Sequence, residues 1–289
     1  NLRGALLGVM RRAVCAGDPD DPAHVAVCPV CWLAAANERP GVERRGYALV
    51  PPLGVPEVLE AGDPFAFHLT LFGDAIRYLP YFLLAIPEVG RVGVGPGRGK
   101  FALRRVWAER LNADDWAVLK EGETTVTPPP QSGDHADVLA AAQHMLPSLQ
   151  TGQGRLTLRF HTPLRLIHQG RLLKAPDFGV FFARLLERLD HLAVQHAAGT
   201  PRPPEAREAL GSAADRVRLV EDRTRWVEVS SGSRRTNRRT WLSGLVGSAV
   251  YTAPPAIWEQ LLPWLLWGQI AQVGKDTPKG NGFYAIEGG

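Results

Sequence analysis

The sequence predicts an α+β protein built from two tandem ferredoxin-like, or RRM-like, domains. The second half of the chain shows the order strand, helix, strand, strand, helix, strand, and the first half shows the same order without its first strand. A loop with three consecutive prolines separates the halves. The length of 289 residues exceeds one typical domain. We expect an N-terminal domain at 1–133 with a cysteine-rich insertion, and a C-terminal domain at 134–289 with a glycine-rich loop.

The C-terminal domain shows its element order most clearly. Residues 155–161 alternate apolar and polar side chains, which predicts a half-buried strand. Residues 177–196 predict an amphipathic helix, because apolar residues recur at helical spacing at Phe178, Phe181, Phe182, Leu185, Leu189 and Leu192. The elements that follow are predicted as strands and one helix at 217–229, 240–252, 255–271 and 283–287.

The N-terminal domain is predicted to begin in a helix at 2–14. The later elements are two strands, a helix and a strand, at 47–52, 64–72, 74–86 and 100–107, and a short helix at 134–146 leads into the second domain. The chain opens in a helical pattern without an initiating methionine, so the first strand is expected upstream of Asn1.

The basic residues are dominated by arginine. Of 33 basic residues five are lysine, which leaves 28 arginines. Arginine presents a planar fork of donors that grips phosphates and stacks on bases, so this composition suits nucleic acid. A genome of high GC content produces the same bias, so composition alone does not decide. The chain has no run of eighteen apolar residues and no signal peptide, which predicts a soluble, cytoplasmic protein without a membrane partner.

A glycine-rich loop is predicted at 273–283, between the last helix and the last strand. Its glycines would let the backbone approach a phosphate closely, and Lys275 and Lys279 would add positive charge. Residues 216–239 hold eight arginines against three acidic residues, a local balance of 8 − 3 = +5. A solvated charged turn would give the same run. Beside a phosphate-binding loop we favour RNA contact by the densest group, Arg234, Arg235, Arg238 and Arg239.

Taken in order, these motifs resemble the CRISPR-associated endoribonucleases of the RAMP superfamily, which process the precursor of guide RNAs. The glycine-rich loop matches the signature of that family, although Asp276 stands where the family usually has glycine. The resemblance extends to segments in both halves, at 78–81, 90–101, 160–166, 234–251 and 266–274.

The resemblance implies binding of CRISPR repeat RNA and metal-independent cleavage by the RNA's own 2′-hydroxyl, with a 2′,3′-cyclic phosphate product and no required cofactor. It places the RNA contacts in the glycine-rich loop, the arginine group and the turn at 90–101, and so at Gly274, Lys275, Lys279, Gly280, Gly282, Arg98 and Lys100. Family members that cut keep a histidine near the first helix, and His24 is the only histidine in 1–67. His24 is therefore the candidate proton acceptor and Lys275 the candidate stabiliser of transition-state charge. His161 and His168 are the fallback, although an ordinary core or surface histidine explains each of them, and we favour that interpretation for His161, which sits in an alternating strand. Tyr78 and Tyr81 could donate a proton, although tyrosines on an apolar helix more often belong to the core.

Three cysteines and one histidine form a local cluster in the N-terminal half. The spacing Cys15-x8-His24-x3-Cys28-x2-Cys31 could hold a structural zinc through the three cysteines, with or without His24. Buried thiols that pack as small apolar groups explain the same pattern equally well. A histidine bound to zinc cannot also accept a proton from RNA, so the two roles of His24 exclude each other.

Two other functions remain open. The chain could be a non-catalytic RAMP subunit that binds the repeat handle of the guide RNA among other subunits of a CRISPR effector complex. Asp276 and the lack of one unambiguous catalytic histidine favour that alternative. The chain could also be a ferredoxin-like protein that binds a small molecule in its glycine-rich loop, in which case the arginine group would have no role.

Overall fold

The computed structural model describes residues 2–18, 21–35, 45–56, 58–95, 97–233 and 238–288, with the backbone alone at 34–35, 231–233, 238–240 and 288. The C-terminal half contains a four-stranded antiparallel sheet with the strand order β12-β5-β11-β8. The strands are β5 (Arg155–Leu164), β8 (Arg218–Val227), β11 (Gly244–Thr252) and β12 (Tyr284–Gly288). Chain order and spatial order together are those of the ferredoxin-like arrangement, because each helix connects two strands that have another strand between them.

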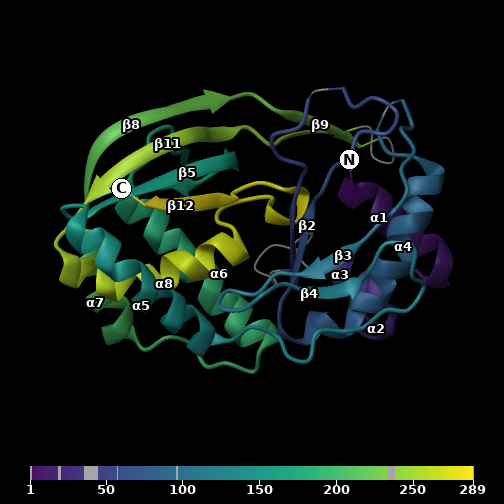
Figure 1. The fold of residues 1–289 in the computed structure, drawn as a ribbon, viewed down its shortest axis with the longest axis horizontal. Coiled ribbons are helices and arrows are strands. Elements are labelled where there is room, and N and C mark those ends of the chain that lie inside the picture. The colour runs from purple at the N-terminus through teal and green to yellow at the C-terminus, as the bar shows by residue number, and fades with distance from the viewer. Residues whose placement is uncertain are drawn as a thin grey trace.

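Four helices cover one face of this sheet and leave the other face open (Figure 1). They are α5 (His135–Thr151), α6 (Phe178–His196), α7 (Pro204–Ala214) and α8 (Pro255–Ala271). The strict alternation of β5 explains the two faces: Leu156, Leu158 and Phe160 are buried in the core, whereas Arg159 and His161 lie on the opposite side. Burial of these apolar side chains between sheet and helices is the main stabilising term for the domain.

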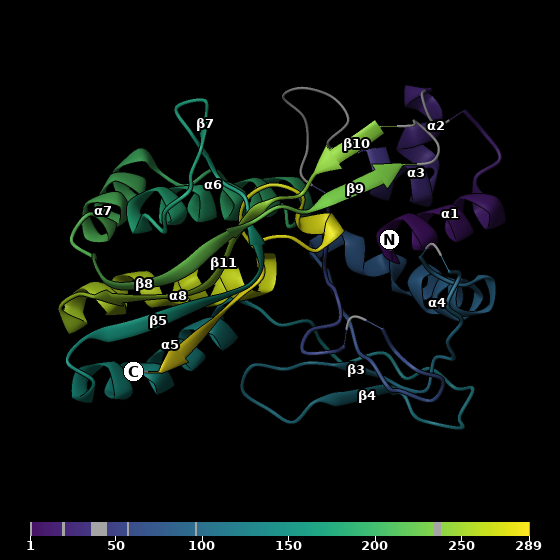
Figure 2. The ribbon, with the colours of Figure 1, turned by 90° about the horizontal axis from the view of Figure 1, so that it is seen from above.

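Two hairpins extend the C-terminal domain. The small hairpin of β6 (Ile167–His168) and β7 (Arg171–Leu172) follows β5 directly. Between β8 and β11, the hairpin of β9 (Ser230–Ser233) and β10 (Arg238–Trp241) reaches toward the N-terminal domain (Figure 2). The predicted strand at 240–252 therefore divides, and its first residues belong to β10.

The N-terminal half packs helices against short antiparallel pairs. Helix α1 (Leu2–Val14) contacts α4 (Leu79–Val92), and β1 (Tyr47–Val50) pairs with β2 (His68–Leu71). Between α1 and β1 lie α2 (Pro22–Val27) and α3 (Pro29–Ala35), and the short 3-10 helix η1 (Gly73–Tyr78) precedes α4. The helix predicted at 74–86 is thus two elements, and the strand predicted at 64–72 begins only at His68.

The strand predicted at 100–107 is largely wrong. Only β3 (Val106–Ala108) pairs there, with the unpredicted strand β4 (Trp116–Leu119). Phe101 and Leu103 alternate as in a strand, but they pack on the N-terminal core cluster from an unpaired segment. An extended chain needs a hydrogen-bonding neighbour to become a strand, and the sequence does not reveal that neighbour.

The two halves meet at two places. The 3-10 helix η2 (Thr277–Lys279) in the glycine-rich loop lies against β1 and α1, and Gln272 Nε2 donates a hydrogen bond of 2.8 Å to Leu49 O (Figure 2). The end of α6 meets the other side, where His196 packs edge-on against Trp32 of α3 with ring centres 5.5 Å apart. In the described part of the chain no helix combines the length and the apolarity that a membrane crossing requires.

Candidate nucleic-acid interface

The glycine-rich loop is held from several directions. The Lys275 N–H donates to Arg165 O at 3.0 Å, the Gly282 N–H to Pro163 O at 3.1 Å, and the Val273 N–H to Gly282 O at 3.0 Å. Asn281 Nδ2 also donates to Leu242 O at 2.8 Å. These bonds tie the loop to the end of β5 and to the segment before β11, so its shape is fixed by its own domain.

Most of the loop is buried, which the sequence did not indicate. Thr277 and Asn281 are 1% and 4% exposed, and Gly280 and Gly282 are buried as well. A Cβ at Gly280 would lie 3.0 Å from Pro51 Cδ of the N-terminal domain. The N–H of Gly280 donates within the loop, to Thr277 O. The predicted RNA contacts of Gly280 and Gly282 therefore gain no support, and both glycines serve the close packing of the loop.

The two lysines of the loop differ in how freely their charge can meet a ligand. Lys279 Nζ lies 2.7 Å from Asp276 Oδ1, so the charge of Lys279 is largely neutralised within the loop. Asp276 has a φ of +66°, in the left-handed region that glycine occupies freely and that Asp tolerates better than most residues. Lys275 is exposed and has no ion-pair partner among the described residues. Lys275 is thus the cation that the loop presents to solvent.

The open face of the C-terminal sheet carries a shallow groove. Its walls include Arg159, His161 and Pro163 from β5 and Arg225 and Val227 from β8. Arg159 Nε pairs with Glu287 at 2.7 Å, whereas Arg225 is exposed and has no ion-pair partner in the described ranges. A groove with a free guanidinium and an aromatic ring suits a nucleotide chain, which offers phosphates and flat bases.

His161 links this groove to the glycine-rich loop. Its ring stacks on the ring of Phe283, the residue after Gly282, with centres 5.6 Å apart and an angle of 29°. Burial, and then the charge of nearby Arg159, lower the pKa of His161 below its usual value of 6.5, and Glu287 opposes them. The imidazole therefore stays neutral at physiological pH and can accept a proton. The alternation of β5 placed His161 on the open face, but nothing in the sequence paired it with Phe283.

Among the other predicted basic residues, the structure describes the side chains of Arg98 and Lys100. Arg238 and Arg239 belong to β10, where the backbone alone is described, and Arg234 and Arg235 lie outside the described residues. Arg98 is in an exposed turn with a φ of +50°, which the bridge between Val94 and Gly99 closes. Lys100 follows that turn and is exposed.

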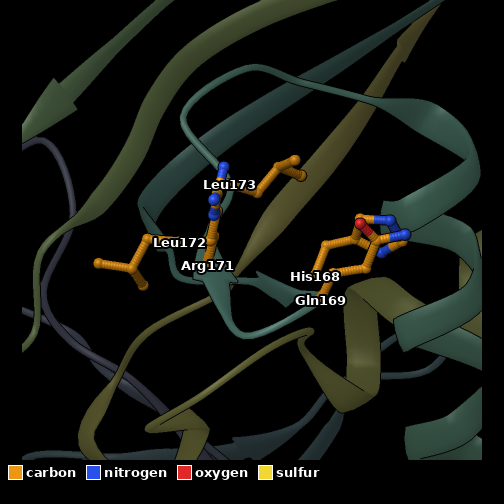
Figure 3. A pocket seen from close by; sticks show the side chains of 5 residues that line it. All are labelled: His168, Gln169, Arg171, Leu172 and Leu173. Atoms are coloured by element: carbon orange, nitrogen blue, oxygen red, sulfur yellow. The ribbon is translucent and has the colours of Figure 1, made fainter.

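His168 and Tyr78, the substitute proton carriers, occupy different settings. His168 lies at the tip of the β6-β7 hairpin and lines a surface pocket with Arg171 (Figure 3). In Figure 3 the side chains of His168 and Gln169 project to one side of the hairpin and Leu172 projects to the other. Tyr78 packs between Trp32 and Tyr81, with the Arg77 guanidinium 4.8 Å from its ring centre, so it is a part of the N-terminal packing.

His24 lies in the cysteine cluster. Its Nε2 is 3.3 Å from Cys15 Sγ, which is itself 3.5 Å from Cys31 Sγ. The ligand atoms of Cys15, His24, Cys28 and Cys31 all lie within 4.8 Å of one another. The structure thus brings together all four residues of the predicted metal spacing.

Family models match both halves of the chain. Residues 1–131 match a family described as an N-terminal domain. Residues 158–284 match the family of the CRISPR-associated endoribonuclease Cas6, and this range contains the groove, His161 and the glycine-rich loop. The C-terminal domain belongs to the Cas6 family. The predicted family, the CRISPR-associated pre-crRNA processing endoribonucleases, is confirmed.

Solved structures of Cas6 proteins share the fold of the whole chain. The product complex of Cas6 (TTHB231) is 18% identical over 99% of this chain and 92% of that chain, with a TM-score of 0.57. The Thermus thermophilus Cas6 (TTHB231) structure is 17% identical over 99% of this chain and 89% of that chain, with a TM-score of 0.55. A chain of a partial Cas6-RT-Cas1–Cas2 complex is 14% identical over 84% of this chain and 39% of that chain, with a TM-score of 0.56.

These likenesses extend over nearly the entire chain and confirm the predicted fold class of two tandem ferredoxin-like domains. No curated protein sequence matches the chain. The Cas6-family match and the shared fold do not identify which residues of this Cas6 domain would act on RNA.

Proposed function

We propose that this protein binds CRISPR repeat RNA and cuts the precursor into guide RNAs. The Cas6-family match over residues 158–284 carries the proposal, because that range holds the exposed lysine of the loop, the groove and a neutral histidine. Repeat RNA would lie along the open sheet face, with phosphates near Arg225 and Lys275. Arg234, Arg235, Arg238 and Arg239 remain proposed RNA contacts because their segment is dense in arginine.

The chemistry we propose needs no metal ion. The RNA's 2′-hydroxyl attacks the adjacent phosphorus, the bond to the departing 5′ oxygen breaks, and a 2′,3′-cyclic phosphate and a 5′-hydroxyl result. The protein must hold this geometry in line, accept the 2′ proton, allow the departing 5′ oxygen to take up a proton from an acid or from water, and stabilise charge on the phosphate. Lys275 is the cation proposed to stabilise that charge, since Lys279 is paired with Asp276.

The proton acceptor is His24 or His161, and the geometry favours His161. Its lowered pKa keeps it neutral, and its stack on Phe283 places it next to the loop that carries Lys275. His24 instead directs Nε2 at a cysteine sulfur. Although the sequence made His24 the first choice, we propose that the substitute His161 accepts the proton.

A cleavage assay with a labelled repeat RNA in excess EDTA tests the function. Cleavage should persist in EDTA, and the 5′ fragment should end in a cyclic phosphate. His161→Ala should slow cleavage by about two to four orders of magnitude with RNA affinity kept. His144→Ala, which alters an exposed histidine on α5, is the matched control and should cut normally.

The pairing of Asp276 with Lys279 favours one alternative, a non-catalytic subunit that holds the repeat handle of the guide RNA, because it lowers the charge available for catalysis. Tight binding of the repeat without any cleavage would establish that alternative. Cleavage by the unmodified protein that disappears in a His24→Ala variant that stays folded and still binds the repeat, but not in His161→Ala, would return the catalytic role to His24.

A further inference from the structure

The cysteine cluster gathers its four side chains from three helices. Cys15 follows the end of α1, His24 lies in α2, Cys28 caps α2, and Cys31 lies in α3. Cys28 and Cys31 are 5% and 1% exposed, and all three cysteines are free thiols. The cluster is therefore a mostly buried set of three sulfurs and one imidazole nitrogen.

The distances within the cluster fit tetrahedral coordination. For bonds of about 2.3 Å to sulfur and 2.0 Å to nitrogen, the edges of a tetrahedron are about 3.8 Å between sulfurs and 3.5 Å between sulfur and nitrogen. In the structure, Cys15 Sγ lies 3.5 Å from Cys31 Sγ and 3.3 Å from His24 Nε2. The longest separation, within 4.8 Å, closes to the ideal edge by about 1 Å of side-chain movement.

Apolar packing accounts poorly for the position of His24. Helix α2 has six residues and none of them is buried, and its Val27 is 79% exposed. So short a helix is not stable by itself, and the core holds it only weakly. Gly17 nevertheless passes so close to His24 that a Cβ there would lie 2.4 Å from Nδ1. The backbone thus pins the ring with Nε2 toward the sulfurs, which is the orientation that a metal ligand needs.

We infer that Cys15, His24, Cys28 and Cys31 bind one structural zinc ion. Three thiolates and one neutral imidazole are a ligand set that zinc prefers, and four protein ligands leave no open position for a substrate. The ion would fasten α1, α2 and α3 to one another. Trp32, the residue after Cys31, contacts His196 of α6, so the ion would also support the contact between the two domains.

Metal analysis of the full-length protein tests the inference. After purification without added metal or chelator, elemental analysis should find about one zinc per chain. A mercurial reagent should release that zinc into a chromogenic chelator as the thiols react. Replacement by cobalt should give the visible absorption of a tetrahedral site with thiolate ligands. None of these measurements depends on RNA cleavage, so the inference can fail while the proposed function holds.

Two variants complete the test. His24→Ala should lose the ion or bind it much more weakly, and His24→Cys, which offers a fourth thiolate, should restore it. His144→Ala should keep one zinc per chain. A folded protein without metal, whose three thiols react freely, would overturn the inference. A mass lower by two hydrogens, the sign of a disulfide between Cys15 and Cys31, would overturn it as well.

Discussion

The close packing of the glycine-rich loop can be tested with the variant Gly282→Ala, which adds one methyl group. The φ of Gly282 is +77°, and a Cβ there would lie 1.8 Å from Val273 O, a distance that real Cβ atoms do not reach. The carbonyl would have to retreat by about 1 Å, and the hydrogen bond from the Val273 N–H to Gly282 O would open. Gly170 is the matched control, because its φ is also +77° and nothing lies within 4 Å of its Cβ position.

The expected magnitudes differ accordingly. An alanine in the left-handed region costs about 1–2 kcal/mol, and Gly170→Ala should cost no more than that. Gly282→Ala adds the loss of the two backbone hydrogen bonds of this residue, from the Val273 N–H to Gly282 O and from the Gly282 N–H to Pro163 O. At about 1 kcal/mol each, they bring the total to about 3–4 kcal/mol. Urea unfolding followed by tryptophan fluorescence measures both changes. Gly282→Ala should also weaken repeat binding, whereas Gly170→Ala should not. Equal destabilisation by the two variants would refute the argument that close packing, rather than φ, fixes this glycine.

Three further predictions concern charge and protonation. Asp276→Asn should free Lys279 and steepen the slope of log K against log salt by about 0.7 for single-stranded RNA; an unchanged slope would mean that Lys279 makes no phosphate contact. Arg225→Ala should flatten that slope by a similar amount, while Arg223→Ala, whose guanidinium is already paired with Glu221, should change it less. Because the pKa of His161 is lowered, kcat/KM should rise with pH along an acid limb whose midpoint lies below 6.5, the usual histidine pKa, and His161→Ala should lose this limb.

The C-terminal domain was predictable because its signals are local. The residues of β5 alone show the alternation that buries Leu156 and Leu158 and exposes Arg159. The helices follow from the spacing of their apolar residues. The cysteine cluster was predictable for the same reason, since seventeen consecutive residues hold all four of its side chains. A pattern of this kind depends little on the rest of the fold.

Features that depend on distant partners could not be predicted. Glycines at Gly280 and Gly282 suggest an open cradle, but Pro51 from the other domain and Val273 from the same loop fill the space that side chains would need. The groove likewise depends on register: β11 lies between β5 and β8, which brings Arg225 near His161. Register describes how two strands pair, and the sequence predicted where the strands lie but not how they pair.

The role predicted for Asp276 from the sequence differs from the role that the structure gives it. Compared with the glycine of the resembling family, an acidic residue predicts weaker phosphate contact. In the fold the same residue has a left-handed φ of +66°, binds the Lys279 ammonium, and accepts the N–H groups of Lys279 and Asn281 through its backbone carbonyl. It therefore meets the backbone requirement that glycine would meet, and it also cross-links the loop internally. The loop gains rigidity and gives up one free cation, which leaves Lys275 as the charge available to RNA.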